Sequence, residues 1–240
     1  MPGHTEEESQ CKAAKVAGLM FLFIVIGWTL NWTFVDSKLI VAGNATATVN
    51  NIMANELLFR IGITNQLIFS ISGVILALAL YIILKPVNKN LALLALFLKL
   101  TEAILGAVIA LCSFIALLIL KGQSLTVFES EQIQAPVGLF LNGRISISAI
   151  PMVFLGLNLM VFLYLLFKSK YVPGILAGFG IFSYALIFIY ALITILLPNY
   201  AAIMVIQIFC WAPSVLFELM IGLWLLIKGI NVERRDTINE

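Results

Sequence analysis

The side chains in this sequence that are best suited to bind a ligand or transfer a proton are charged groups inside long apolar runs. Lys99 and Glu102 interrupt one such run, and Glu218 interrupts another. A charge at the centre of a lipid bilayer costs at least about 2.5 kcal/mol, and side chains kept there often bind an ion, relay a proton or hold a polar solute. These three residues are therefore the first candidates for a site that binds a substrate or an ion.

The two carboxylates lie at the same depth if their runs are membrane helices. With a rise of about 1.5 Å per residue, Glu102 stands roughly 16 Å from the nearer end of its run, and Glu218 about 15 Å from the nearer end of its own. Both distances correspond to the middle of a hydrocarbon core about 30 Å thick. The same arithmetic brings Asn158 and Tyr184 close to this layer. We therefore add Asn158 and Tyr184 to the candidates.

Helical periodicity gives these runs an inward face. Lys99, Glu102 and Gly106 follow steps of three and four residues, and Glu218 and Gly222 continue a similar stripe in the last run. A stripe of small and polar residues, with Leu, Ile and Phe elsewhere, is typical of a helix that faces other helices rather than lipid. The candidate side chains are therefore expected to point into a bundle.

Two interpretations of this polar layer remain open. In the first, Glu102 and Glu218 form a site that titrates or binds a solute. In the second, Lys99 and Glu102, which are three residues apart, neutralise each other, and the other polar groups only hold helices together. Hydrogen bonds of this second kind contribute about 0.6 kcal/mol each.

Arg60 is the sixth candidate and stands near the other end of its run. Glu56 precedes it by four residues, which is the order that favours an ion pair on a helix surface. This spacing predicts a solvated pair at the membrane interface. If Arg60 instead reaches Asn65 or Gln66, it would belong to an access path to the site.

The elements that must position these side chains are transmembrane helices. Of the 240 residues, 62% are apolar and 11% are charged, against about 45–50% and about 25% in soluble domains. This composition excludes a soluble enzyme, a nucleic-acid-binding protein and a disordered chain. A membrane helix needs about 20 mostly apolar residues. Six runs qualify: 16–35, 57–84, 91–120, 145–167, 172–197 and 200–227. We predict an all-α fold, a six-helix transmembrane bundle.

The charges that flank these runs predict how the bundle sits in the membrane. Nine of the 14 Lys and Arg residues lie on the side of both termini, and four lie on the other side. Because the side rich in basic residues is usually cytoplasmic, both termini are expected in the cytoplasm. The predicted organisation is a polar cytoplasmic tail at 1–15, a single transmembrane domain at 16–228 and a second polar cytoplasmic tail at 229–240.

Two connections on the other side are longer than the rest, at 36–56 and 121–144. Few helix-breaking residues occur within 45–59, so the second helix is expected to begin there, outside the membrane. The apolar stretch 137–141 is expected to lie on the membrane surface.

Histidine and cysteine usage excludes several kinds of chemistry. His4 is the only histidine and stands in a polar tail, and the three cysteines are widely spaced. Neither a His-based metal centre nor a Ser-His or Cys-His catalytic pair is expected from one chain. We predict no metal and no cofactor.

Five stretches and one glutamate, in this order, resemble a known family. They are 56–60 (ELLFR), 84–95 (LKPVNKNLALLA), 99–103 (KLTEA), 168–178 (KSKYVPGILAG), Glu218 and 224–232 (WLLIKGINV). Over nearly its whole length the chain resembles the bacterial membrane family catalogued as domain of unknown function 4386. The resemblance implies a six-span protein of the bacterial plasma membrane, and it supplies no activity. Lys99 stands where the family is expected to have arginine, and Gly174 where a basic residue is expected.

Three classes of function remain. The first is translocation of a small solute or protons, or binding of a small ligand, through the midplane layer. Six helices without a clear inverted repeat are few for a secondary transporter, unless a homodimer forms. The second is a non-transporting accessory, sensor or assembly protein. The third, a lipid-modifying intramembrane enzyme, ranks last because no span contains histidine or a nucleophile–base motif. The expected partners are the lipid bilayer and a small solute or proton, with no nucleic acid.

Overall fold

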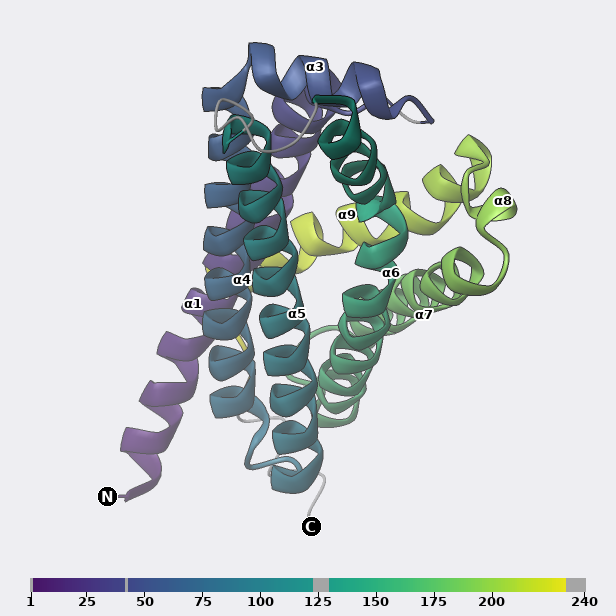
Figure 1. Ribbon diagram of the computed structural model, residues 1–240. Coiled ribbons are helices and arrows are strands. Elements are labelled where there is room, and N and C mark those ends of the chain that lie inside the picture. Colours follow the sequence, from purple (N-terminus) through teal and green to yellow (C-terminus); the bar gives the residue numbers. More distant parts are fainter. Residues whose placement is uncertain (1, 42, 123–129, 232–240) are drawn as a thin grey trace.

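The computed structural model describes residues 2–41, 43–122 and 130–231, and every regular element in these ranges is helical (Figure 1). Six of the described helices are long and apolar enough to cross a membrane, which confirms the predicted six-helix transmembrane bundle. They are α1 (Pro2–Asn31), α4 (Glu56–Leu84), α5 (Lys89–Lys121), α6 (Ser130–Ser169), α7 (Gly174–Leu196) and α9 (Met204–Ile227). Shorter described elements join them: the π-helix η1 (Trp32–Asp36), α2 (Ser37–Leu39), α3 (Ala45–Ala54) and α8 (Pro198–Ala201).

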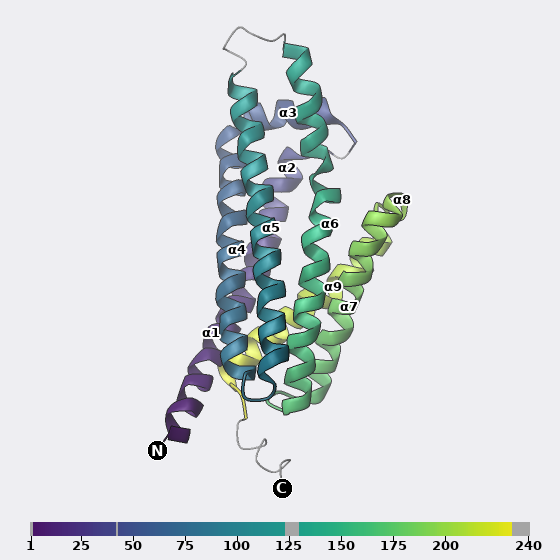
Figure 2. The same cartoon turned by 60° about the horizontal axis from the view of Figure 1, so that its bottom comes forward.

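The six long helices pack as a closed ring. Each packs mainly on its two neighbours, in the order α1, α4, α5, α6, α7, α9 and back to α1. Helices α4, α5 and α6 stand side by side, whereas the hairpin of α7, α8 and α9 leans away from them and ends short of α3 (Figures 1 and 2). The ring is therefore more open toward the end that carries α3.

The opposite end of the bundle holds the main apolar core. All six long helices contribute buried side chains to this core, among them Phe21, Leu80, Phe162 and Phe217, and Tyr171 joins them from the turn between α6 and α7. The start of α1 lies at this end, because the Gln10 side chain donates a hydrogen bond to the carbonyl of Ile83, near the end of α4 (2.9 Å). The chain beyond α9 returns to the same end, where the backbone N–H of Asn231 donates to the Tyr171 carbonyl (3.2 Å).

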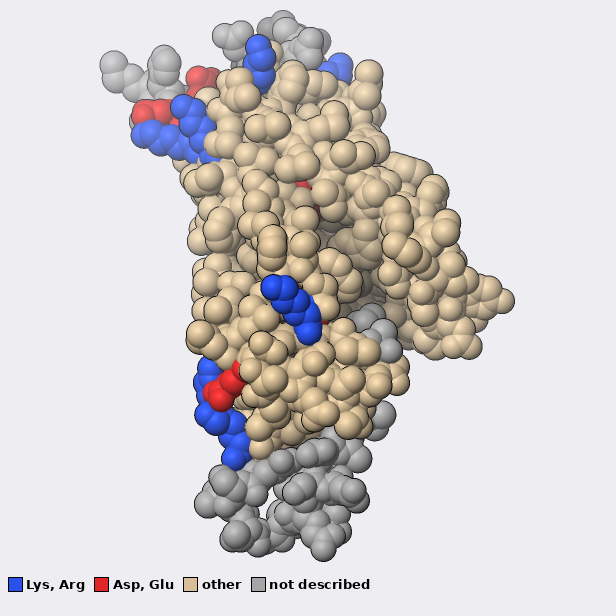
Figure 3. All heavy atoms as spheres, turned by 90° about the horizontal axis from the view of Figure 1, so that it is seen from above, with Lys and Arg blue, Asp and Glu red and all other residues tan. Residues whose placement is uncertain are grey.

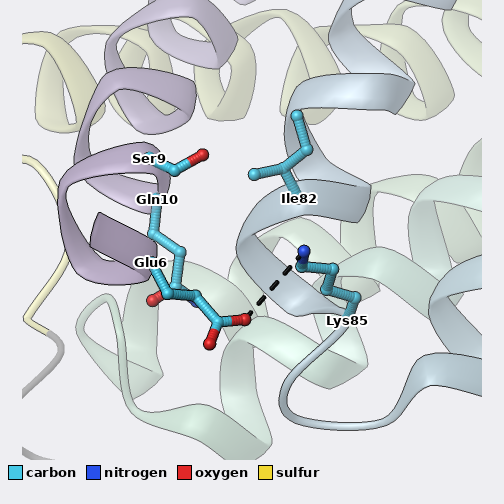
Figure 4. A pocket seen from close by; sticks show the side chains of 5 residues that line it. All are labelled: Glu6, Ser9, Gln10, Ile82 and Lys85. Carbon is cyan, nitrogen blue, oxygen red and sulfur yellow. Dashed lines mark ion pairs between the residues drawn. The ribbon is translucent and has the colours of Figure 1, made fainter. Parts of the chain in front are cut away.

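Helix α1 begins at Pro2, so polar residues expected as a separate tail form its first turns. A pocket of about 280 Å³ lies between these turns and the end of α4 (Figure 4). Glu6 and Gln10 line it from α1, while Lys85 lines it from the turn after α4 and lies 3.9 Å from the Glu6 carboxylate. This pocket is remote from the candidate residues at mid-depth.

Polar caps and prolines set the ends of several helices. The Asn88 side chain accepts a hydrogen bond from the backbone N–H of Leu91 (3.0 Å), so it caps α5 after a tight turn. Pro173 precedes α7 with an extended backbone, and this position prevents α6 from continuing into α7. Because both turns are short, consecutive helices are antiparallel neighbours.

The connection 36–56 forms more structure than the sequence predicts. Residues 45–54 form a separate helix, α3, which lies across the end of the bundle (Figure 1), and the chain breaks at Asn55 before α4 begins. The expectation that the second membrane helix begins within 45–59 therefore holds only from Glu56 onward. Helix α3 stays separate because its buried face, Val49 and Ile52, packs mainly against α6 and joins an apolar cluster with the end of α5.

The connection 121–144 also differs from the expectation. The stretch 137–141 does not lie on the membrane surface but belongs to the first part of α6, a helix of 40 residues. Val137 and Leu141 are buried against α3 and the end of α5. Burial of this apolar face explains why α6 extends far beyond the segment that would cross a bilayer.

The last predicted run, 200–227, is interrupted at Ala202. Pro198 begins the short helix α8, and α9 starts only at Met204. The carbonyl of Ala201 accepts hydrogen bonds from the side chains of Gln207 (3.0 Å) and Tyr190 (3.3 Å). In a continuous helix a backbone N–H group would donate to this carbonyl, and here the two side chains donate instead.

Two glycines let α1 and α9 approach closely. A Cβ atom on Gly18 would lie 2.8 Å from the backbone oxygen of Gly222 and 2.9 Å from the backbone nitrogen of Leu226. Contacts this short involve backbone on both sides, so no side-chain rotation relieves them. Small residues that permit such close crossings are typical of membrane helix pairs.

We expect Gly18→Ala to lower the free energy of unfolding by about 1–3 kcal/mol, because the added methyl group must push α9 away from α1. Gly178→Ala is the matched control, since a Cβ atom there meets nothing within 4 Å. The control should be neutral or slightly stabilising, as alanine has the higher helix propensity. Thermal unfolding in mild detergent measures both, and equal effects of the two variants would contradict the close crossing.

Candidate functional site

Lys99 and Glu102 form an ion pair on the inward face of α5. The Lys99 Nζ lies 2.6 Å from the Glu102 Oε1, and the two side chains are 8% and 18% exposed. The lysine lies against α4, where a Cβ atom on Gly73 would be 2.8 Å from its Cε. Glycine at this position thus makes room for a charged side chain between two helices.

Asn158 joins this pair from α6. Its Nδ2 donates to the Glu102 Oε2 (2.8 Å) and to the Phe154 carbonyl (2.6 Å), and the residue is fully buried. Both partners accept hydrogen bonds, so they fix which end of the amide faces Glu102. The Asn158 Oδ1 is then left buried without a hydrogen-bond partner.

Tyr184 and Glu218 form a second pair, between α7 and α9. The Tyr184 hydroxyl donates a hydrogen bond to the Glu218 Oε1. Tyr184 is buried at the edge of the apolar core, with its ring edge-on to Phe217 at 6.0 Å between centroids. The hydrogen bond therefore holds the Glu218 carboxylate at the boundary between the core and the layer above it.

The two pairs belong to one electrostatic environment. The charges of Lys99 and Glu102 both act on the Glu218 carboxyl, and Glu102 also acts on Tyr184. Five of the six predicted site residues lie in these two hydrogen-bonded groups, from four helices: Lys99 and Glu102 from α5, Asn158 from α6, Tyr184 from α7 and Glu218 from α9. We call these five residues the polar layer.

The polar layer is largely buried, but two of its side chains are partly exposed. Glu102 keeps 18% of its side chain exposed, and Glu218 is only half-buried. Seen from the end that carries α3, the surface is hollowed between the main body and the projecting hairpin of α7, α8 and α9, and acidic atoms are visible among uncharged ones beside the hollow (Figure 3). Toward the opposite end the main apolar core closes the ring.

Small and polar side chains of α4 and α5 continue from the polar layer toward the α3 end. A Cβ atom on Gly106 would lie 2.9 Å from the Ser70 Oγ and 3.3 Å from the Gln66 Nε2. Gly106 lies one turn beyond Glu102 on the same helix face. The side of the ring above Glu102 is therefore lined by polar groups that approach the α5 backbone.

Arg60 does not belong to the polar layer. Its Nε lies 2.7 Å from the Glu56 Oε1, which also lies 3.0 Å from the Lys121 Nζ, and its guanidinium stands 5.8 Å from the centre of the Phe114 ring. The structure thus shows the ion pair expected from the spacing, at the outer end of α4 and α5. Asn65, the alternative partner, donates instead to Asn31.

A second polar cluster was not predicted from the sequence. Asn65 Nδ2 donates to the Asn31 Oδ1 (2.9 Å), and Asn31 Nδ2 donates to the Asp36 Oδ2 (2.9 Å). Asn31 and Asp36 are buried, and Asp36 ends the π-helix that closes the first span. A π-turn adds one residue to a helical turn and shifts which residues face inward. Sequence periodicity assumes a regular helix, so it gave no signal for Asp36.

No metal site is evident in the described part of the chain. Histidine, cysteine, aspartate and glutamate side chains do not gather there in groups of three or more that would hold a metal ion. What the polar layer offers is two carboxylates, one ammonium group, one amide and one phenol. These groups can exchange protons, accept hydrogen bonds and balance the charge of a small solute.

The fold and the polar layer together define a class of protein: a multi-pass membrane protein with a ring of six helices and a layer of charged and hydrogen-bonded side chains at mid-depth. Residues 16–229 match the family described as Domain of unknown function (DUF4386), and the chain belongs to this family. The resemblance seen in the sequence is thus confirmed. Comparison with curated proteins and with solved structures found no significant match.

We expect Glu102→Gln to lower the free energy of unfolding by about 3 kcal/mol, because it leaves the Lys99 ammonium group buried without a counter-charge. The double variant Lys99→Met with Glu102→Gln removes both charges and should recover to within about 1 kcal/mol of the unsubstituted protein. Thermal unfolding in mild detergent at neutral pH tests the pair. A double variant as unstable as the single one would show that the ion pair does not account for the loss.

Proposed function

We propose that the protein binds a small solute, or a proton, in the polar layer and moves it across the membrane. The observation that carries this proposal is the position of two carboxylates, Glu102 and Glu218, in one layer inside a ring of membrane helices, where each is still partly exposed. Charged groups in this setting are costly, and they are typical of substrate and proton pathways.

The arrangement supports proton or solute exchange at Glu218 in particular. Glu102 already has a counter-charge in Lys99, whereas Glu218 accepts a hydrogen bond from the neutral Tyr184 hydroxyl. A carboxylate with a neutral partner can take up a proton or a positively charged group without separating an ion pair. Lys99 and Glu102 then set the local field in which Glu218 works.

The shape of the ring supports access from the α3 end. The hairpin of α7, α8 and α9 leans away on that side, and Gln66, Ser70 and Gly106 line the wall above Glu102. The main apolar core, with Leu80 and Phe217 fully buried, closes the other side. Release toward the other side would require this core to open, as in an alternating-access cycle.

A packing role is the second candidate, and one observation favours it. The Asn158–Glu102 bond joins α6 to α5, and the Tyr184–Glu218 bond joins α7 to α9. Polar bonds between helices are also what a non-transporting accessory, sensor or assembly protein would use to fix its packing. In that case the protein would show no flux and would co-purify with a partner. Enzymatic action on a lipid is the least supported class.

We also propose that the protein sits in a bacterial plasma membrane, with the ends of α1 and α9 in the cytoplasm. The excess of basic residues on that side supports this orientation.

A homodimer would supply the additional helices that larger transporters have in one chain. Size determination in detergent by light scattering tests that proposal.

Thiol labelling tests the orientation. Cys11 is exposed near the start of α1, whereas Cys210 is buried. We expect a membrane-impermeant maleimide to label Cys11 in inverted vesicles and not in intact spheroplasts. Thr46→Cys, at an exposed position of α3, is the control in a Cys11→Ser background and should show the opposite pattern. Labelling of Cys11 from outside would reverse the proposed orientation.

Flux measurements test the function. In proteoliposomes with a pH-sensitive dye inside, we expect Glu218→Gln to reduce proton movement, alone or with solutes added, by at least about tenfold, because glutamine keeps the Tyr184 bond but carries no charge. Glu56→Gln is the matched control at the outer end of α4 and should leave flux unchanged. Equal flux in the unsubstituted protein and in empty liposomes, over a panel of solutes, would favour the packing role.

A further inference from the structure

We propose that the solute of the polar layer is a small organic cation that donates hydrogen bonds, namely a protonated amine or the ammonium ion. This inference rests on the proposed function and goes further by assigning the chemical class of the ligand. It depends on three features of the described residues: the balance of charge in the layer, one buried oxygen without a donor, and the partial exposure of the two carboxylates.

With Glu218 ionised, the balance of charge favours a cation over an anion. The layer contains two carboxylates, Glu102 and Glu218, and one ammonium group, Lys99. Lys99 is bonded to Glu102 at 2.6 Å, so its charge is already matched. An anionic solute would meet the Glu218 carboxylate without a free counter-charge, whereas a cation would complete the charge balance.

The buried oxygen identifies what the ligand must donate. Among the described residues, two buried side-chain polar atoms lack a hydrogen-bond partner: the Tyr171 hydroxyl, in the apolar core, and the Asn158 Oδ1, in the polar layer. The Asn158 amide cannot turn over, because its Nδ2 donates to two acceptors. A buried acceptor left without a donor costs about as much as a lost hydrogen bond. A ligand with an N–H group would supply the missing donor.

The partners available favour an N–H cation over a metal ion. The oxygens of Glu102 are engaged by the Lys99 Nζ and the Asn158 Nδ2. A metal ion would have to compete with these donors and would lie close to the Lys99 ammonium group. A protonated amine instead forms directed hydrogen bonds to single oxygens.

The limited exposure of the site residues favours a small solute. Asn158 is fully buried, Glu102 is 18% exposed and Glu218 is half-buried. The surface seen from the α3 end is hollowed between the main body and the hairpin of α7, α8 and α9 (Figure 3). A compact cation could approach along Gln66 and Ser70 and lose its water only at the layer. An ammonium ion without N–H groups would not satisfy the Asn158 oxygen.

Thermal stabilisation of the purified full-length protein tests the inference. At constant ionic strength, methylammonium chloride should raise the melting temperature in a saturable way, whereas tetramethylammonium, sodium and acetate should not. Tetramethylammonium is the matched probe, since it carries the same charge without a donor. We expect Glu218→Gln to weaken methylammonium binding at least tenfold, which corresponds to about 1.4 kcal/mol, and Glu56→Gln to leave it unchanged.

Two outcomes would overturn the inference: equal stabilisation by sodium or tetramethylammonium, or a methylammonium effect that survives Glu218→Gln. Glu218-dependent flux of another solute or of protons, without methylammonium binding, would refute the cation inference and leave the proposed function standing. Saturable methylammonium binding that requires Glu218, in a protein that moves nothing in proteoliposomes, would support the ligand class and refute transport.

Discussion

Inside a bilayer a polar side chain must find its partners within the protein, because hydrocarbon offers none. The rest of the structure follows from this constraint. Glu102 can stand at mid-depth because Lys99 lies one turn away on the same helix and Asn158 reaches it from α6. Glu218 has its partner in Tyr184 on a neighbouring helix. Each carboxylate therefore requires a particular neighbour, and these requirements join α5 to α6 and α7 to α9.

The two halves of the ring are packed differently. In the half near the chain ends, apolar side chains from six helices fill the centre, and Gly18 and Gly222 let α1 and α9 touch through their backbones. In the other half the hairpin of α7, α8 and α9 leans outward, and a separate apolar cluster under α3 holds the ends of α5 and α6. The polar layer lies at the edge of the tightly packed half. The apolar core closes the ring below the layer, and the layer itself is partly exposed.

The outer end shows that irregular backbone also creates polar structure. The π-helix at Trp32–Asp36 brings Asp36 to the buried side of the first span, where Asn31 connects it to Asn65 on α4. Arg60 lies nearby in sequence but forms its own exposed group with Glu56 and Lys121. Buried amide contacts and more exposed ion pairs thus coexist on the same helix: the first link α4 to α1, and the Glu56–Lys121 pair links α4 to α5.

The sequence by itself determined the number and type of the spans, because a length of about 20 apolar residues is a local property. It also determined the Lys99–Glu102 pair, since helical spacing fixes it, whereas the equal depth of Glu102 and Glu218 stays a prediction. Only the tertiary structure decided that Asn158 meets Glu102 and that Tyr184 meets Glu218. Depth follows from counting residues along one helix, whereas lateral contact depends on the order, tilt and rotation of helices that are far apart in sequence. The separate helix α3 and the extension of α6 were likewise decided by the tertiary structure, because each depends on an apolar face buried by other elements.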